Sequence, residues 1–116
     1  MIMSNKKKIS KSLSGKRVWV PGHTGLVGSS LIPRLKNENC EVIKITRSNL
    51  DLLDKFAIDK FLKKERIDQV FVCAAKVGGI LANSQYSAGF IRENLLISLN
   101  IIDSCHQHDV NDLIFL

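Results

Sequence analysis

The chain has 116 residues and a formal net charge of +6, with 45% hydrophobic and 24% charged residues, a composition that excludes a disordered chain. The whole charge excess lies in residues 1–17, which hold six basic residues and no acidic one, whereas residues 18–116 carry 11 of each sign. A neutral body argues against a nucleic-acid-binding domain. We interpret residues 1–16 as a basic disordered leader, although organellar transit peptides also begin without acids, and residues 17–116 as one domain.

Cysteine spacing and apolar runs argue against a disulfide, a metal site and a membrane span. The chain has three cysteines, Cys40, Cys73 and Cys105, and no two of them form a CxxC pair. We therefore expect neither a disulfide framework nor a zinc site, and a reduced, cytoplasmic setting is favoured. We expect Cys73 and Cys105 to lie in the core. No apolar run approaches the ~20 residues that a membrane-spanning helix needs.

Hydrophobic periodicity predicts strands and helices that alternate after the leader. Short apolar runs predict the strands, apolar positions three or four residues apart predict the helices, and Asp54 is a good N-cap residue for the second helix. In chain order, the strands are expected at residues 17–21, 41–46, 68–75 and 112–116, and the helices from residue 26, from residue 54 and over about 87–108. Pro33 lies inside the first helix and removes one of its backbone hydrogen bonds.

The order βαβαβαβ with short connections predicts an α/β fold, a Rossmann-like, doubly wound parallel sheet. We expect the strand order 3-2-1-4, with the switch point between the first and fourth strands, and an incomplete sheet. On the long helix, apolar residues cover an arc of roughly 200°, more than packing on one sheet needs. A partner subunit or a remaining part of the domain would cover the surplus.

A glycine-spaced segment follows the first predicted strand and leads into the first helix. Gly22 allows a tight turn, Gly25 lets the backbone approach a pyrophosphate, and Gly28 lets the helix lie close to the sheet. The helix N-terminus offers free N–H groups and the positive end of its dipole to phosphates. The segment therefore predicts a dinucleotide site rather than a tight turn without a ligand. Its cofactor-binding residues are expected to be Gly22, His23, Thr24, Gly25, Leu26, Val27 and Gly28.

The end of the second strand bears on the choice of cofactor. NAD-binding proteins usually place an acidic residue there to hold the adenosine ribose, but this chain has Arg47. A guanidinium group suits a 2′-phosphate by its charge and paired hydrogen bonds, so NADP(H) is favoured. The alternative is that Arg47 is only a solvated surface residue. Asp51 and Leu52 follow, and we expect them beside the adenine.

These motifs together resemble those of the extended short-chain dehydrogenase/reductases. Residues 72–83, which contain the run AAKVGGI, and residues 90–110 are similar to segments of the GDP-L-fucose synthase family, and the likeness covers about residues 16–116. Ala74, Ala75 and Lys76 follow the third predicted strand and complete the expected cofactor-binding set. Lys76 is expected either to contact the cofactor or to be an ordinary surface lysine.

The resemblance implies an NADP-dependent oxidoreductase and epimerase that epimerises GDP-4-keto-6-deoxy-mannose at two ring carbons and reduces it at C4. It also implies a homodimer, a Ser/Tyr/Lys group for reduction, and a Cys and a His for epimerisation. We expect no catalytic residue within this chain, because Tyr86 is its only tyrosine, position 90 is Phe, and the family's catalytic Ser and Cys are expected beyond Leu116.

The chain alone is therefore expected to bind cofactor without catalysing the reaction. Two alternatives remain open at this point. The first alternative is that the chain is part of another NAD(P)-dependent nucleotide-sugar epimerase or dehydratase. The second is that it is a non-enzymatic dinucleotide-binding module or a truncated remnant. The glycine segment does not separate these alternatives, whereas the AAKVGGI run favours the GDP-L-fucose synthase family.

Overall fold

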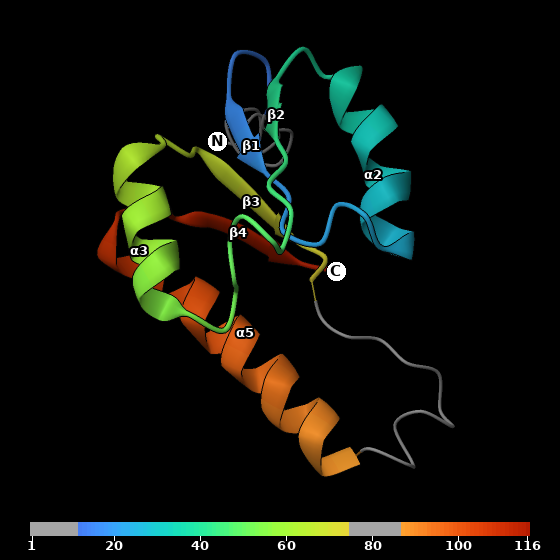
Figure 1. The fold of residues 1–116 in the computed structure, drawn as a ribbon. Coiled ribbons are helices and arrows are strands. Elements are labelled where there is room, and N and C mark those ends of the chain that lie inside the picture. The colour runs from blue at the N-terminus through green and yellow to red at the C-terminus, as the bar shows by residue number, and fades with distance from the viewer. Residues whose placement is uncertain (1–11, 75–86) are drawn as a thin grey trace, which may run out of the picture.

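The computed structural model describes residues 12–74 and 87–116, which form a parallel sheet with helices on both faces (Figure 1). The strands are β1 (Arg17–Trp19), β2 (Glu41–Ile43), β3 (Gln69–Val72) and β4 (Asp112–Phe115). The helices are α2 (Leu26–Lys36), α3 (Lys55–Lys64) and α5 (Ser87–Gln107). All the strand pairs are parallel, so the predicted α/β, Rossmann-like class is confirmed.

The order of the strands in the sheet differs from the predicted 3-2-1-4. The observed order is β2-β1-β3-β4, so the switch point lies between β1 and β3. β3 takes an inner position because it is apolar and buried, with Val70 0% and Val72 3% exposed. β2 lies at the edge and begins at the exposed Glu41. A strand that is apolar on both faces gains most from an inner, covered position, and this preference decides the order.

Alternate residues of the central strands face two hydrophobic cores. The main core lies under α3 and α5 and includes Trp19, Val70 and Ile101, and the Trp19 ring lies 4.9 Å from the ring of Phe61. The second core lies under α2, and its buried residues are Val18, Val20, Ile32 and Leu35. The period-2 alternation of side chains along β1 thus assigns its residues to opposite faces of the sheet.

The helix ends follow the predicted signals closely. Asp54 precedes α3, and its Oδ1 accepts a hydrogen bond from the Ala57 backbone N–H at 3.2 Å, which confirms the predicted N-cap. α2 continues past Pro33 to Lys36, although proline removes one of its backbone bonds. α5 ends at Gln107, one residue before the predicted end.

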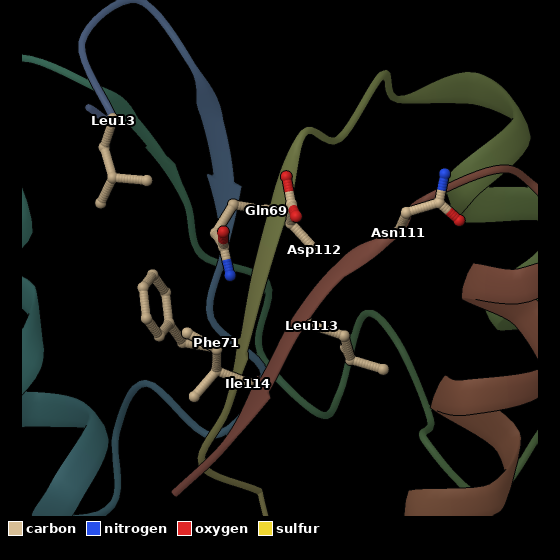
Figure 2. A pocket seen from close by; sticks show the side chains of 7 residues that line it. All are labelled: Leu13, Gln69, Phe71, Asn111, Asp112, Leu113 and Ile114. Carbon is tan, nitrogen blue, oxygen red and sulfur yellow. The ribbon is translucent and has the colours of Figure 1, made fainter. Parts of the chain in front are cut away.

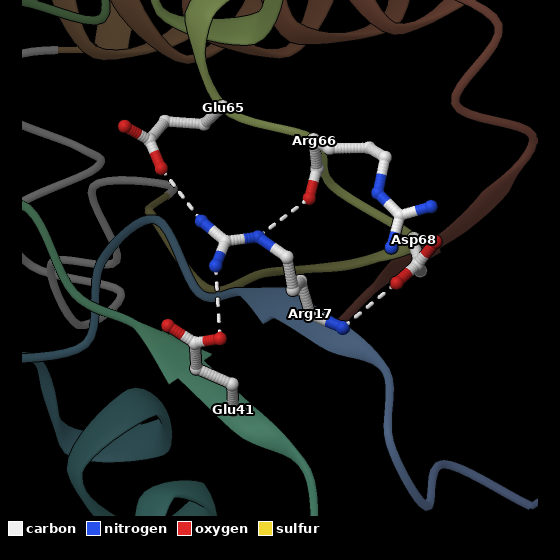
Figure 3. A network of polar contacts seen from close by, with 5 residues as sticks. All are labelled: Arg17, Glu41, Glu65, Arg66 and Asp68. Atoms are coloured by element: carbon white, nitrogen blue, oxygen red, sulfur yellow. Dashed lines mark hydrogen bonds and ion pairs between the residues drawn. The ribbon is translucent and has the colours of Figure 1, made fainter.

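Arg17 connects β1, β2 and the segment between α3 and β3 at the amino-terminal edge of the sheet (Figure 3). Its guanidinium donates to Glu41 Oε1 at 2.8 Å, to Glu65 Oε1 at 2.6 Å and to the Arg66 carbonyl at 2.7 Å. Its backbone N–H donates to Asp68 Oδ2 at 2.8 Å. The network fixes β1 against β2 and against the segment that enters β3, at the end of the sheet opposite the glycine segment.

The division into a leader and a domain at residue 17 stays a prediction. Within the described part of residues 1–16, the Gly15 N–H donates to the Asn39 carbonyl at 2.9 Å, and Leu13 packs against the second core. The predicted cofactor residues Ala75 and Lys76, and the residue Tyr86, lie outside the described residues.

Candidate cofactor-binding site

The glycine segment leaves β1 at the carboxyl edge of the sheet and turns tightly against the end of β3. Gly22 has φ +85°, and a Cβ there would lie 2.5 Å from backbone atoms of Cys73 and Ala74. The Cys73 N–H donates to the Pro21 carbonyl at 2.9 Å, which holds the two strand ends together. Only glycine satisfies both the left-handed conformation and this close approach. The predicted tight turn at Gly22 is thus present.

The other two glycines of the segment meet different surroundings. A Cβ on Gly28 would collide with the Gly22 carbonyl oxygen, so Gly28 lets α2 pack against the turn. A Cβ on Gly25 would lie 3.5 Å from the same oxygen, which is ordinary contact, and no other neighbour in the described part of the chain lies within 4 Å. The fold of this chain therefore requires Gly22 and Gly28 but leaves space at Gly25.

Among residues 12–74 and 87–116, no side chain caps the N-terminus of α2. Gly25 is the N-cap residue, makes no side-chain capping hydrogen bond, and is followed by no acidic residue in the first turn. The first N–H groups of a helix have no partner within the helix, and the dipole is positive there. Leu26 is 88% exposed and Val27 47%, so the start of the helix is open to solvent. This end of α2 can accept an anion.

His23 and Thr24 lie in the turn between Gly22 and Gly25. Thr24 is exposed, and His23 is half-buried. The His23 Nδ1 atom is buried and has no hydrogen-bond partner among residues 12–74 and 87–116. An unpaired buried ring nitrogen is unfavourable unless a ligand or water satisfies it.

Arg47 lies four residues after β2 and extends toward the end of β3. Its Nη2 donates to the Ala74 carbonyl at 3.2 Å. Asp51 accepts a hydrogen bond from the Leu53 N–H at 2.9 Å, which shapes the turn before α3. The Leu52 side chain is only 5% exposed and packs in the main core, so only its backbone is available to a ligand.

The structure thus brings most of the predicted residues to one edge of the sheet. The glycine turn, the start of α2, Arg47 and Ala74 gather where β1, β2 and β3 end. Leu52 points into the core instead. The sequence offered no signal for the contribution of Pro21 and Cys73, because it arises from backbone hydrogen bonding between strands that are distant in the chain.

A second polar cluster, distinct from the Arg17 network, joins α3 to the end of α5. Lys55 Nζ donates to Asp59 Oδ2 at 3.0 Å and to Gln107 Oε1 at 2.8 Å, and His108 Nε2 lies 3.5 Å from Asp59 Oδ1. The Ser104 hydroxyl first, then Lys55 and His108, hold the pKa of the Asp59 carboxyl below its ordinary value, against the opposing effect of burial. Sequence reasoning missed this cluster because its members come from two helices far apart in the chain.

The cysteines are placed as thiols in or near the cores. Burial raises the pKa of the Cys105 thiol to about 11 and also raises the pKa values of the Cys40 and Cys73 thiols. Cys105 lies in the main core, as predicted, and Cys73 is half-buried against the second core. A thiol with a raised pKa is a poor nucleophile, because little of it is present as the reactive thiolate.

A hollow of about 400 Å³ lies elsewhere, over the beginnings of β3 and β4 (Figure 2). Gln69, Phe71 and Ile114 line it, together with Leu13. It contains none of the predicted cofactor-binding residues and lies away from the carboxyl edge of the sheet. In residues 12–74 and 87–116, no group of three or more His, Cys, Asp or Glu side chains is arranged to hold a metal ion, and no helix is long and apolar enough to cross a membrane.

A parallel sheet with a glycine turn before its first helix defines this part of the chain as a Rossmann-like α/β domain. A family model described as the NAD dependent epimerase/dehydratase family matches residues 18–116. The chain therefore belongs to this family of epimerases and dehydratases.

Individual relatives narrow the comparison. The chain is 49% identical to the GDP-L-fucose synthase of Escherichia coli over 105 residues, which cover 90% of this chain and 33% of that protein. A GDP-mannoheptose C4 reductase from Campylobacter jejuni with NADP bound has a TM-score of 0.79 and 34% identity, over 87% of this chain and 32% of its own. A GDP-L-fucose synthetase from Naegleria fowleri bound to NADP has a TM-score of 0.72 and 27% identity, over 86% of this chain and 30% of its own. The chain spans about a third of these relatives.

Proposed function

We propose that this chain is the NADP(H)-binding portion of an enzyme that epimerises and reduces GDP-4-keto-6-deoxy-mannose to GDP-L-fucose. The proposal rests on family membership, on the similarity to GDP-L-fucose synthases and on the edge of the sheet described above. NADPH, when bound, supplies the hydride for the reduction. The residues of this chain bind and orient it.

The observation that carries the proposal is the open N-terminus of α2 beside Gly25. Its first N–H groups, which have no side-chain cap among the described residues, and its positive dipole suit a pyrophosphate, and Gly25 leaves space there between the described residues. Gly25 stands at the start of this helix, where a glycine allows the close approach of a ligand to the backbone. The buried Nδ1 of His23 provides one further polar atom that a ligand or its water would satisfy.

Arg47 supports the choice of NADP(H) over NAD(H). Arg47 follows β2 in the segment where NAD-binding members of this fold carry an acidic residue for the adenosine ribose, and this supports a contact between its guanidinium and that end of the cofactor. Its remaining N–H donors fit a 2′-phosphate. Similar solved structures contain NADP, which agrees with this assignment.

The substrate class is a GDP-linked 4-keto sugar. The 48–49% identity of this chain to GDP-L-fucose synthases favours the 6-deoxyhexose substrate. The similarity to a GDP-mannoheptose C4 reductase makes reduction of a GDP-linked heptose the second candidate. Competition between the two GDP-sugars for the enzyme that contains this chain distinguishes these candidates.

The 116-residue chain by itself is proposed to bind the cofactor without turnover. It has a single tyrosine, Tyr86, and no Tyr-x-x-x-Lys sequence, so it lacks the proton donor that carbonyl reduction in this superfamily requires. Oxidation of NADPH by the purified chain in the presence of GDP-4-keto-6-deoxy-mannose would contradict this part of the proposal.

We also propose a cytoplasmic homodimer that forms through α5. Ile91, Leu95, Leu99 and Ile102 follow one another at helical spacing and are 43–64% exposed. An adjacent side of α5 packs into the main core through Ile97, Ile101 and Cys105. A long helix that is apolar on two sides is suited to packing against a second copy of itself.

Gly25→Ala tests the proposed cofactor site directly. The added methyl group fits the chain but intrudes where the pyrophosphate approaches, so we expect NADPH to bind at least about tenfold more weakly, with the fold retained. Isothermal titration calorimetry measures the affinity.

Gly89→Ala is the matched control. Gly89 has open space around its Cβ position and lies in α5, so the substitution leaves NADPH binding unchanged and stabilises the helix by about 0.5–1 kcal/mol. Equal affinity of Gly25→Ala and the parent chain for NADPH would contradict the proposed site.

A further inference from the structure

The contact between Arg47 and Ala74 spans three strands of the sheet. Arg47 follows β2 and Ala74 follows β3, and β1 lies between these two strands. The hydrogen bond from Arg47 Nη2 to the Ala74 carbonyl, at 3.2 Å, therefore passes over the end of β1, where the glycine turn begins. No backbone ladder connects β2 to β3 directly, because they are not neighbours.

The end of β3 is in turn one wall of the glycine turn. The Cβ position of Gly22 is 2.5 Å from the carbonyl of Cys73 and from the Ala74 nitrogen, and the Cys73 N–H bonds to the Pro21 carbonyl. A displacement of residues 73–74 must therefore displace the turn as well. Arg47, Ala74 and Gly22 form one contiguous set of contacts.

We infer that Arg47 is a positioning residue for the whole dinucleotide site, in addition to its proposed role as a ligand of the 2′-phosphate. It braces the end of β3 against the segment after β2 and so holds the glycine turn in its binding shape. A guanidinium group has five N–H donors, and one bond to Ala74 leaves the others free for a phosphate. This inference rests on the proposed NADP(H) site.

A positioning role of Arg47 predicts a result that a role in binding the 2′-phosphate alone does not predict. NADH has no 2′-phosphate, so the loss of a mere phosphate contact would leave NADH binding unchanged. If Arg47 holds the site together, Arg47→Ala weakens NADH binding about fivefold, the effect of one charge-assisted hydrogen bond at a partly exposed site. If Arg47 instead closes the site and must release Ala74, the same variant binds NADH more tightly.

A second measurement needs no cofactor. Amide hydrogen exchange, followed by NMR, reports on the hydrogen bond from Cys73 to Pro21 at the braced end of the β1–β3 pair. The bond from the Asp68 N–H to the Arg17 carbonyl, at 2.9 Å, reports on the opposite end of the same pair. In Arg47→Ala we expect exchange at Cys73 to be several-fold faster and exchange at Asp68 to be unchanged.

Lys44→Ala is the matched control, because it removes an exposed positive charge from the same segment and has no contact with Ala74. We expect it to leave NADH affinity and both exchange rates unchanged. Unchanged or tighter NADH binding in Arg47→Ala would overturn the brace, as would an unchanged rate at Cys73 or equal acceleration at Cys73 and Asp68. A parent chain that binds neither dinucleotide refutes the proposed function, and exchange at Cys73 then decides on the brace alone.

Discussion

At the scale of single residues, the three evenly spaced glycines of the turn, Gly22, Gly25 and Gly28, are explained by different physical causes. Gly22 and Gly28 are required by the chain, because a methyl group on either would meet backbone atoms of the turn or of β3. Gly25 has space around its Cβ position among the described residues, and the proposed pyrophosphate site accounts for a glycine there. The sequence motif predicted all three positions, but it did not separate fold from function, since the distinction depends on which atoms lie nearby.

Arg47 shows a similar limit. Its position after the second strand indicated a role in cofactor choice, whereas its bond to Ala74 became visible only in three dimensions. Leu52, which is expected beside the adenine, directs its side chain into the main core, so only its backbone is available for the predicted contact. Its apolar side chain and its place beside Leu50, another core residue, are the signals that favoured burial.

Asp59 provides a prediction about pH. Its pKa is lower in the folded chain than the ordinary value of 3.8, so its stabilising contribution is complete above that value and is lost as the pH falls through the lower folded-state pKa. We expect Asp59→Asn to lower the unfolding free energy at pH 7 by about 1 kcal/mol, and the difference from the parent to shrink below about pH 4. Urea unfolding, followed through the single tryptophan Trp19, measures it.

Asp103→Asn is the control for this experiment, because Asp103 is exposed on α5. It is expected to change the unfolding free energy little at any pH. A difference between Asp59→Asn and the parent that stays constant from pH 7 down to pH 3 would show that the Asp59 charge is not the cause.

At the scale of elements, the sequence predicted each helix and strand within a few residues but not the order of the strands. The first two strands are shorter at their carboxyl ends than the sequence predicts. β1 ends at Trp19 and β2 at Ile43, where the chain turns toward the candidate site. The predicted strand order 3-2-1-4 is wrong because it follows the usual order of the dinucleotide-binding fold and not the burial of the individual strands. The buried, apolar β3 and the exposed Glu41 on β2 already favoured the observed arrangement.

α5 is the element on which the proposed dimer depends. Its exposed Leu95 and Leu99 lie one turn apart, so two glutamates there would place like charges in the interface. We expect the parent chain to sediment as a dimer and the double variant Leu95→Glu/Leu99→Glu to sediment as a monomer at the same concentration. Analytical ultracentrifugation distinguishes the two species.

Phe56→Glu is the matched control for this surface. Phe56 is 79% exposed, but it lies on α3 and does not belong to the exposed apolar residues of α5. The control is expected to remain dimeric. A parent chain that is monomeric at all concentrations, or a double variant that remains a dimer, would exclude α5 as the interface.

At the scale of the whole molecule, a sheet clamped at one end by Arg17 presents an open glycine turn at the other. The Rossmann-like class and the tight glycine turn between the first strand and the first helix could both be predicted from the sequence, because alternating periodicity and the glycine spacing depend on local order. The Arg17 network and the Asp59 cluster could not, because they join side chains distant in the chain. The combination of rigid sheet, uncapped helix and arginine is suited to holding a phosphorylated dinucleotide.

The most direct test of this account is calorimetric titration of the full chain with NADPH and with NADH under the same conditions. A guanidinium–phosphate pair contributes about 1.5–3 kcal/mol, so we predict that NADPH binds at least about tenfold more tightly than NADH. Equal affinities for the two cofactors, or no binding of NADPH, would contradict the assignment of this chain as an NADP(H)-binding domain.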